Sequence, residues 1–230
     1  MILRSFPFAA LLPLLAITST SAEEAKDIAQ VMISSATTTF AGKKVTENEM
    51  LKPPGSLKTG AEGGAKVKLV ANDVVIEVAA NSEVNFTLPP SADPSESIEL
   101  IKGKVRVRVP KAKDKDAKNA KAKFMLRHKK ATMGVRGTDF VAVVNEELDE
   151  TELVVFEGKV EFANEVSPRD VQFVTAGYWS GLGGRYGEKV RAPIRLSTKA
   201  IDYFDKLSRS TPSYSIEKSP SGAQTTSPGH

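Results

Sequence analysis

The sequence predicts an all-β fold, either an antiparallel sandwich or a β-solenoid-like stack, followed by a short helix and a disordered tail. The main observation is a period of two in the apolar residues from about 28 to 174, in runs rich in Val, Ile, Phe and Thr. Turn residues separate these runs about every eight to twelve residues. In the clearest run, residues 104–109, charged and apolar residues alternate strictly, which places one strand face in the core and the other in water.

The first 22 residues predict an export signal. Arg4 supplies the positive charge, residues 6–17 form an apolar stretch, and small residues at 20–22 form a cleavage site. The apolar stretch is shorter than the roughly 20 residues that span a bilayer, so cleavage is favoured over anchoring. We therefore expect a mature chain from Glu23, in the periplasm or outer cell envelope, with no stable membrane span after cleavage.

The mature chain is predicted to form one domain over residues 23–196, with its β core at about 28–177. Further strands are expected over residues 65–70, 74–78, 82–88, 140–144, 153–156, 159–163 and 171–175. A proline-rich turn is expected at 89–95 and a solvated Lys-rich loop at 111–123. Residues 197–208 predict a helix that begins after Ser197, and residues 209–230 predict a disordered tail.

Two segments resemble each other, residues 100–107 and residues 155–162. Each has an apolar pair, a charged residue, Gly-Lys-Val, a further charged residue and an apolar residue. We expect Gly103 and Gly158 to take a positive φ in tight hairpins. Two interpretations stay open, that hairpins simply look alike or that the chain contains a repeated structural unit, as in a solenoid.

Several of these segments together resemble the FecR domain of bacterial envelope proteins. The resemblance is carried by residues 57–60 and 65–69, by both Gly-Lys-Val segments, by Met-Gly-Val-Arg-Gly-Thr-Asp-Phe at 133–140, and by residues 174–177. It implies an all-β extracytoplasmic domain with no known catalytic activity.

The family's namesake regulators relay a receptor signal to a sigma factor, and they carry a cytoplasmic domain and a membrane helix before the periplasmic part. Only Met1 to Ser5 precede the apolar stretch here, so we expect the module without direct control of a sigma factor.

The net charge of +4 conceals a basic segment. Residues 102–130 carry a local charge of +11, which leaves −7 for the rest of the chain. This segment is a candidate surface for anionic or glycan envelope polymers, although a solvated, solubilising loop is the simpler interpretation. Nucleic acid is not expected as a partner, since aromatic residues do not alternate with the lysines.

Candidate interaction residues come from three places in the sequence. Arg136 and Asp139 could offer paired charges to a ligand, although a structural role is favoured, with Gly137 at a bend and Asp139 satisfying local backbone donors. Trp179 could stack on a sugar, although packing is the simpler role, helped by a flexible Gly-rich loop at 181–187. The candidate set is Arg136, Asp139, Lys111, Lys113, Lys115, Lys118, Lys121, Lys123, Arg127, Lys129, Lys130 and Trp179.

Catalysis, metals and cofactors are not expected. The chain has no cysteine, and its two histidines are His128, among basic residues, and His230 at the end. An acidic run at 146–152 lacks the spacing of a calcium loop and predicts a soluble hairpin tip. A hydrolase built from Asp139 or this run has little support. The leading hypothesis is a non-enzymatic, exported module that acts through an envelope protein partner.

Overall fold

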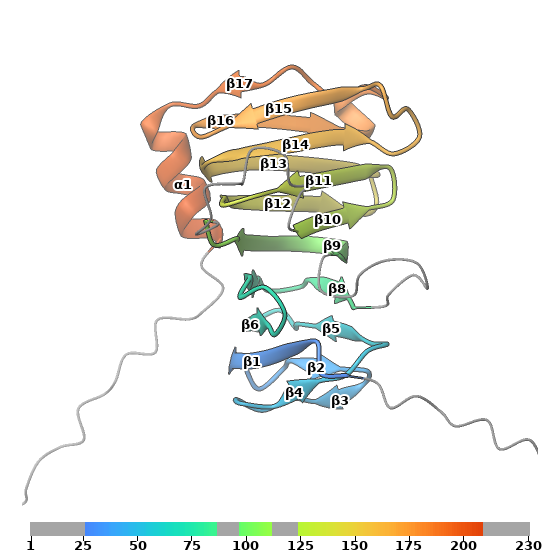
Figure 1. Cartoon of the computed structure of the whole chain (residues 1–230), viewed down its shortest axis with the longest axis vertical. Helices are drawn as coiled ribbons and strands as arrows, with labels where there is room; N and C mark the ends of the chain where they lie inside the picture. The colour runs from blue at the N-terminus through green and yellow to red at the C-terminus, as the bar shows by residue number, and fades with distance from the viewer. Residues whose placement is uncertain (1–25, 87–96, 112–123, 209–230) are drawn as a thin grey trace, which may run out of the picture.

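The computed structural model describes residues 26–86, 97–111 and 124–208. These residues form two β-sheets packed face to face and extended along one direction, with the N-terminal strands at one end and β17 at the other (Figure 1). One short helix follows the strands and lies along the side of the stack. The predicted fold class, all-β with a short C-terminal helix, is confirmed.

Sheet A is antiparallel throughout. Its strands lie in this spatial order: β4 (Met50–Leu51), β1 (Ala29–Ser34), β6 (Ala65–Leu69), β7 (Val75–Val78), the second part of β9 (Ser97–Arg108), β12 (Asp139–Asn145), β13 (Glu150–Glu157), β16 (Tyr178–Leu182) and β17 (Ile194–Arg195).

Sheet B is antiparallel except where β9 and β10 run parallel. Its strands lie in this order: β3 (Lys43–Lys44), β2 (Thr39–Phe40), β5 (Ser56–Lys58), β8 (Glu83–Asn85), the first part of β9, β10 (Phe124–His128), β11 (Ala131–Val135), β14 (Lys159–Asn164) and β15 (Val171–Thr175). The central strand β9 therefore belongs to both sheets.

The hairpins predicted at Gly103 and Gly158 are wrong, although both glycines have a positive φ, 87° and 82°. Within β9, Lys102 pairs with β8 of sheet B, whereas Gly103 already pairs with β12 of sheet A. Gly158 separates β13 of sheet A from β14 of sheet B, and these two strands do not pair with each other. Each glycine is thus a corner at which the chain passes between the sheets.

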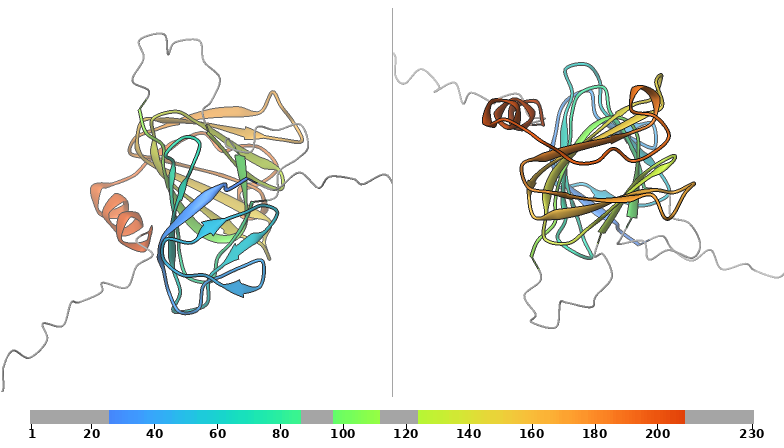
Figure 2. Two further views of the ribbon diagram at one scale, coloured as in Figure 1. Left: turned by 60° about the horizontal axis from the view of Figure 1, so that its bottom comes forward. Right: turned by 90° about the horizontal axis from the view of Figure 1, so that it is seen from above.

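The core lies between the two sheets and follows the alternation of the sequence. On β9, Val105 and Val107 are fully buried, and four phenylalanines from both sheets, Phe86, Phe124, Phe140 and Phe162, are also fully buried. Each such side chain contributes about 1.5 to 3 kcal/mol through removal of apolar area from water. The view along the stack shows the two sheets enclosing this space (Figure 2).

The helix α1 (Thr198–Ser208) begins as predicted. The Oγ of Ser197 accepts a hydrogen bond from the backbone N–H of Ala200 at 3.2 Å, the arrangement of an N-cap. The helix runs beside sheet A, where it meets β9 and β13 (Figure 1). None of the helices in the described residues is long and apolar enough to cross a bilayer.

Candidate functional site

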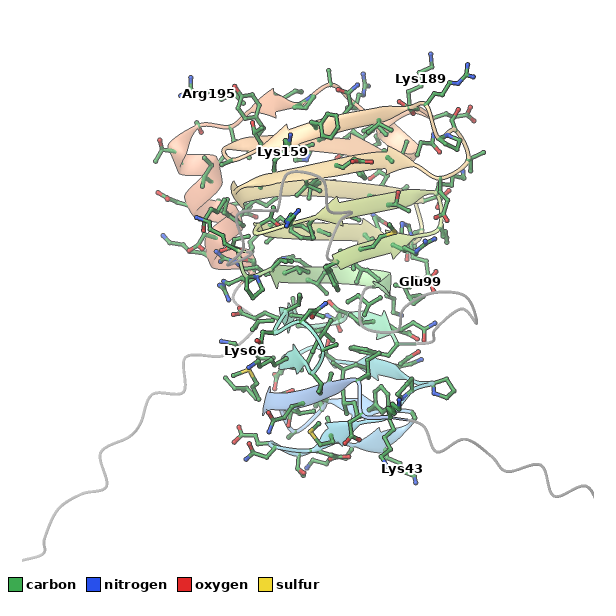
Figure 3. The ribbon with its side chains drawn as sticks, viewed as in Figure 1. Lys43, Lys66, Glu99, Lys159, Lys189 and Arg195 are labelled. Carbon is green, nitrogen blue, oxygen red and sulfur yellow. The ribbon has the colours of Figure 1, made fainter. Side chains whose placement is uncertain are left out.

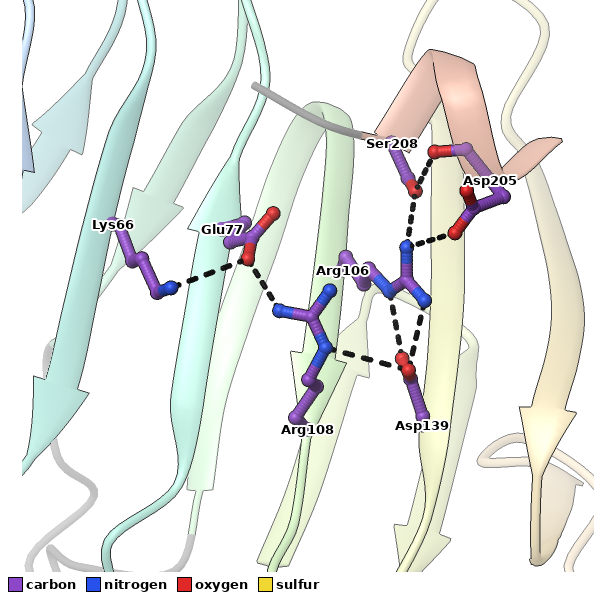
Figure 4. A network of polar contacts seen from close by, with 7 residues as sticks. All are labelled: Lys66, Glu77, Arg106, Arg108, Asp139, Asp205 and Ser208. Atoms are coloured by element: carbon purple, nitrogen blue, oxygen red, sulfur yellow. Dashed lines mark hydrogen bonds and ion pairs between the residues drawn. The ribbon is translucent and has the colours of Figure 1, made fainter. Parts of the chain in front are cut away.

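Charged and polar residues of sheet A and α1 meet on the outer face of the sheet. We call this set the Arg106 cluster: Lys66, Glu77, Arg106, Arg108, Asp139, Asp205 and Ser208 (Figure 4). Because Val105 and Val107 point into the core, the alternation of β9 directs Arg106 and Arg108 outward. Asp139 begins β12 and is the partner of Arg108 in the strand register. The Arg106 cluster therefore forms because β9, which contains the first Gly-Lys-Val segment, pairs with β12, which begins within the segment 133–140.

Arg106 is the centre of the cluster. Its Nε and Nη2 donate to the two carboxylate oxygens of Asp139, both at 2.8 Å. Its Nη1 donates to Asp205 Oδ1 at 2.6 Å and to Ser208 Oγ at 3.2 Å, both on α1. The guanidinium lies 4.5 Å from the ring centre of Phe156, and the side chain is only 7% exposed. Arg106 thus ties β12 and α1 to β9.

The electrostatics of the cluster are balanced. Burial alone would lower the pKa of Arg106, but its hydrogen bonds to Asp139 and Asp205 raise that pKa above the ordinary value. Arg108 contacts Asp139 at 3.3 Å and also pairs with Glu77, which in turn lies 3.7 Å from Lys66. The charges compensate one another within the cluster, as in structural ion-pair networks, which also shift pKa values.

The segment 133–140, which carries part of the resemblance to the FecR domain, supplies a corner between two strands and one carboxylate of the Arg106 cluster. Gly137, with φ of 61°, lies at the corner between β11 and β12. Asp139 binds two arginine side chains, whereas the sequence predicted that it satisfies local backbone donors. Arg136, in the same corner, is partly buried.

The described members of the basic segment do not form one surface. Lys111 pairs with Glu157, Arg127 of sheet B contacts Glu165 at 2.6 Å, and Lys129 and Lys130 contact Asp149 at 3.6 and 3.0 Å. Arg106 is buried under α1. Five candidates lie outside the described residues: Lys113, Lys115, Lys118, Lys121 and Lys123.

Trp179 packs in a second polar cluster on sheet A. Its Nε1 donates to Glu152 Oε2 at 3.1 Å, and its ring meets Tyr186 edge to face with centroids 5.0 Å apart. The hydroxyl of Tyr186 donates to the other oxygen of Glu152 at 2.9 Å. Gly181 leaves no room for a Cβ, which would lie 2.8 Å from Tyr186. The missing side chain at Gly181 thus allows Tyr186 to pack against Trp179.

Two buried polar residues were not predicted. Glu150 is 1% exposed and receives hydrogen bonds from the guanidinium and the backbone N–H of Arg185, which lower its pKa. His128 is 2% exposed, and its Nδ1 lies 2.7 Å from Thr151 Oγ1 across the sandwich. The signal for His128 was its place in the alternation Phe124, Leu126, His128, which directs it inward.

The described residues contain no group of three or more histidine, aspartate or glutamate residues placed to hold a metal ion. What the fold and the clusters define is a two-sheet β module with charge-compensated faces.

Comparison with known proteins identifies this module. Residues 55–161 match the family model described as FecR protein. These residues are therefore a FecR domain, and the assignment made from the sequence is confirmed. Comparison with curated proteins gave no match.

Among solved structures, the chain is similar to two crystal structures, at 2.50 and 1.65 Å resolution, of a protein from Parabacteroides distasonis ATCC 8503 described as a candidate anti-sigma factor. Each match has a TM-score of 0.50 at 15% sequence identity and covers 65% of this chain and 63% of that one. At this identity the likeness concerns the fold.

Proposed function

We propose that this chain is a non-enzymatic, exported FecR-domain protein that acts by binding another protein of the cell envelope, in signalling or regulation. The observation that carries the proposal is the set of hydrogen bonds that Asp139 accepts from two arginine side chains. This acidic residue belongs to the segment 133–140 that carries part of the resemblance to the FecR domain, and it binds Arg106 and Arg108. The segment therefore builds a surface and not a reaction centre.

The comparisons support a regulatory role. The matched family is FecR protein, and the similar solved structures are described as those of a candidate anti-sigma factor. Binding residues are commonly positioned by a rigid scaffold, and the long, well-packed sandwich supplies one. Export is supported by the charge, apolar stretch and small residues of positions 1–22.

Polymer binding through residues 102–130 is the weaker alternative. Its described cations are divided between the outer face of sheet A, sheet B and the turn after β10, and most of them are already paired with carboxylates. A polymer would have to displace these pairs to use the cations.

The proposal is tested by in-cell crosslinking of the full chain followed by mass spectrometry, together with the mass of the purified mature chain. We expect a mature chain that starts near Glu23 and reproducible crosslinks to an envelope protein. A chain that retains its first 22 residues would contradict cleavage of the export signal. Recovery of crosslinks to no protein, with retention on purified cell wall at low salt only, would favour the polymer alternative.

A further inference from the structure

The two ends of the stack differ in how their edge strands are protected. At the N-terminal end, the edges are the two-residue strands β3 and β4, and β3 consists of Lys43 and Lys44. At the C-terminal end, sheet A closes with the two-residue strand β17 after Pro193. Short strands, lysines and prolines are devices that prevent edge pairing. Sheet B, by contrast, ends in β15, five residues with the uncharged sequence Val-Gln-Phe-Val-Thr.

The backbone of β15 is open on its outer side. Among the described strands only β14 pairs with it, in the register Lys159 to Thr175. The neighbouring bonds from Asn164 N to Asp170 O and from Ala176 N to Gly158 O show which β15 residues face β14. Because hydrogen-bonded and non-hydrogen-bonded positions alternate in an antiparallel ladder, residues 172 and 174 bond to β14. The N–H and C=O groups of Val171, Phe173 and Thr175 therefore point away from the sheet; we call these three residues the open edge.

The segment that caps the core leaves the open edge uncovered. Val190, 4% exposed, closes the end of the core, and its N–H donates to Asp170 just before β15. The chain then crosses to sheet A, where Arg191 N–H donates to Gly181 O and β17 pairs with β16. No backbone hydrogen bond of the described residues reaches the outer side of the open edge. Phe173 is 55% exposed.

Positive charges flank the open edge. Lys189 adjoins Val190 near the start of β15, and Arg195 pairs with Tyr178 just beyond its end. Lys159 lies opposite Thr175, with its ammonium 4.8 Å from the centre of the Phe173 ring. Figure 3 shows Lys189 and Arg195 on either side of this end of the stack, with Lys159 nearby. None of the three forms an ion pair within the described part of the chain. The acidic residues on β14, in the turn before β15 and beside Lys189 are Glu161, Glu165, Asp170 and Glu188, of which Glu165 contacts Arg127.

We propose that the open edge binds an extended, acidic polypeptide segment of a partner protein, which adds a strand to sheet B. This inference names the surface and the partner chemistry for the proposed protein-binding function, and it rests on that function. Strand addition uses the free backbone groups for affinity and the flanking side chains for selectivity. Carboxylates on the added strand would meet Lys159, Lys189 and Arg195.

A second copy of the chain fits this end less well. Two copies joined through the open edge would bring Lys189 and Arg195 of one copy toward the same residues of the other, and like charges oppose such an approach. The partner strand is therefore expected to be of opposite charge, which distinguishes the proposal from self-association.

The test uses the full chain and a fluorescent peptide of alternating glutamate and valine, with binding followed by anisotropy. We expect saturable binding that weakens with salt, and no binding of the matching peptide of lysine and valine. N-methylation of alternate peptide nitrogens removes backbone donors and should weaken binding by roughly tenfold or more. This peptide control does not depend on the folding of any variant.

Two protein variants complete the test. Thr175→Pro removes an outward N–H without loss of a bond to β14, and it should weaken binding by roughly fivefold or more, whereas Thr175→Ala keeps the N–H and should bind as the parent does. Charge reversal of Lys189 and Arg195 to glutamate should abolish the preference for the acidic peptide. Equal binding of the lysine peptide, indifference to N-methylation, or equal loss in both Thr175 variants would overturn the proposal.

Two further outcomes separate the edge from the general function. A dimer that forms with increasing concentration and disappears in Thr175→Pro would assign the edge to a second copy. In cells, a photo-crosslinker at position 175 should capture the partner, whereas one at position 43, in the edge strand at the N-terminal end of the stack, should not. Capture at position 43 alone would overturn the edge proposal and leave the protein-binding function standing.

Discussion

The two Gly-Lys-Val segments have nearly the same sequence pattern and the same bend, yet they carry the chain in opposite directions. At Gly103 the chain passes from sheet B to sheet A, and at Gly158 it passes from sheet A to sheet B. The two corners also lie at opposite ends of β12, since Val144 pairs with Gly103 and Asp139 pairs with Glu157. The likeness is therefore that of a local corner, and it is not a repeat of one folding unit.

The two corners also differ in what lies against them. A Cβ on Gly103 would lie 2.3 Å from the Oγ of Ser82, and a Cβ on Gly158 would lie 2.7 Å from the carbonyl oxygen of Gly137 and 2.8 Å from the Cγ2 of Thr138. Ser82 Oγ accepts the N–H of Lys104 at 2.9 Å, whereas Thr138 Oγ1 is buried without a hydrogen-bond partner among the described residues. A side-chain hydrogen bond thus supports the first corner, whereas Thr138 supports the second through packing, beside the backbone bond from Ala176 N to Gly158 O.

The largest effect is expected from the corner glycines. Gly103→Ala and Gly158→Ala combine an unfavourable positive φ with a clash against backbone atoms, so each should lower the free energy of unfolding by about 3 to 5 kcal/mol. Gly187→Ala is the control, because its φ is 82° but no atom lies within 4 Å of the new Cβ. It should cost only about 1 to 2 kcal/mol in urea unfolding. Equal losses at all three sites would mean that the contacts at the corners are unimportant.

The next largest effect compares Arg106 and Glu161, the charged residues that follow Gly-Lys-Val in the two segments. Arg106→Met removes the partner of Asp139 and Asp205 and should cost about 2 to 4 kcal/mol, below the full cost of isolating a buried charge because both carboxylates keep some access to water.

Glu161→Gln, on the exposed face of β14, should change stability by less than about 0.5 kcal/mol. Limited proteolysis should also cleave α1 faster in Arg106→Met, since Asp205 and Ser208 lose their anchor. A helix as well protected as in the parent would show that apolar contacts alone hold α1.

A smaller effect tests the residues that support each corner. Ser82→Ala leaves the Lys104 N–H without its acceptor and should cost about 1 to 3 kcal/mol. Thr138→Val removes a hydroxyl that has no described partner and keeps the shape, so thermal unfolding should occur at an unchanged or slightly higher temperature. A marked loss in Thr138→Val would contradict the view that Thr138 supports the Gly158 corner by packing and not through its hydroxyl.

The sequence predicted the class of fold because alternation at positions such as Val105 and Val107 is a local property. It also predicted the positive φ of Gly103 and Gly158 and the capping role of Ser197, which depend on near neighbours. It did not predict that Arg106 meets Asp139 and Asp205, since those contacts depend on which strands pair and where α1 lies. The hairpin prediction failed for the same reason, because a corner and a hairpin need the same glycine.

The smallest effect concerns pH and His128, which ends β10 and contacts Thr151 of β13. Burial lowers the pKa of His128, Lys129 lowers it further, and Asp149 and Glu146 oppose this shift only in part. The unfolded chain therefore binds a proton near pH 6.5 that the folded chain does not accept until lower pH. Stability should be constant above about pH 7 and should fall as the pH drops below about 6.5, until the folded-state pKa is passed.

Asp149 also loses its stabilising pairs on protonation, but its pKa is lowered from an ordinary value near 4, so that loss begins in a separate, more acidic window. Urea midpoints measured from pH 7.5 to 5 should therefore decline in the parent and remain flat in His128→Gln, whose side chain does not titrate. A parallel decline in both proteins would assign the pH dependence to the carboxylates around His128.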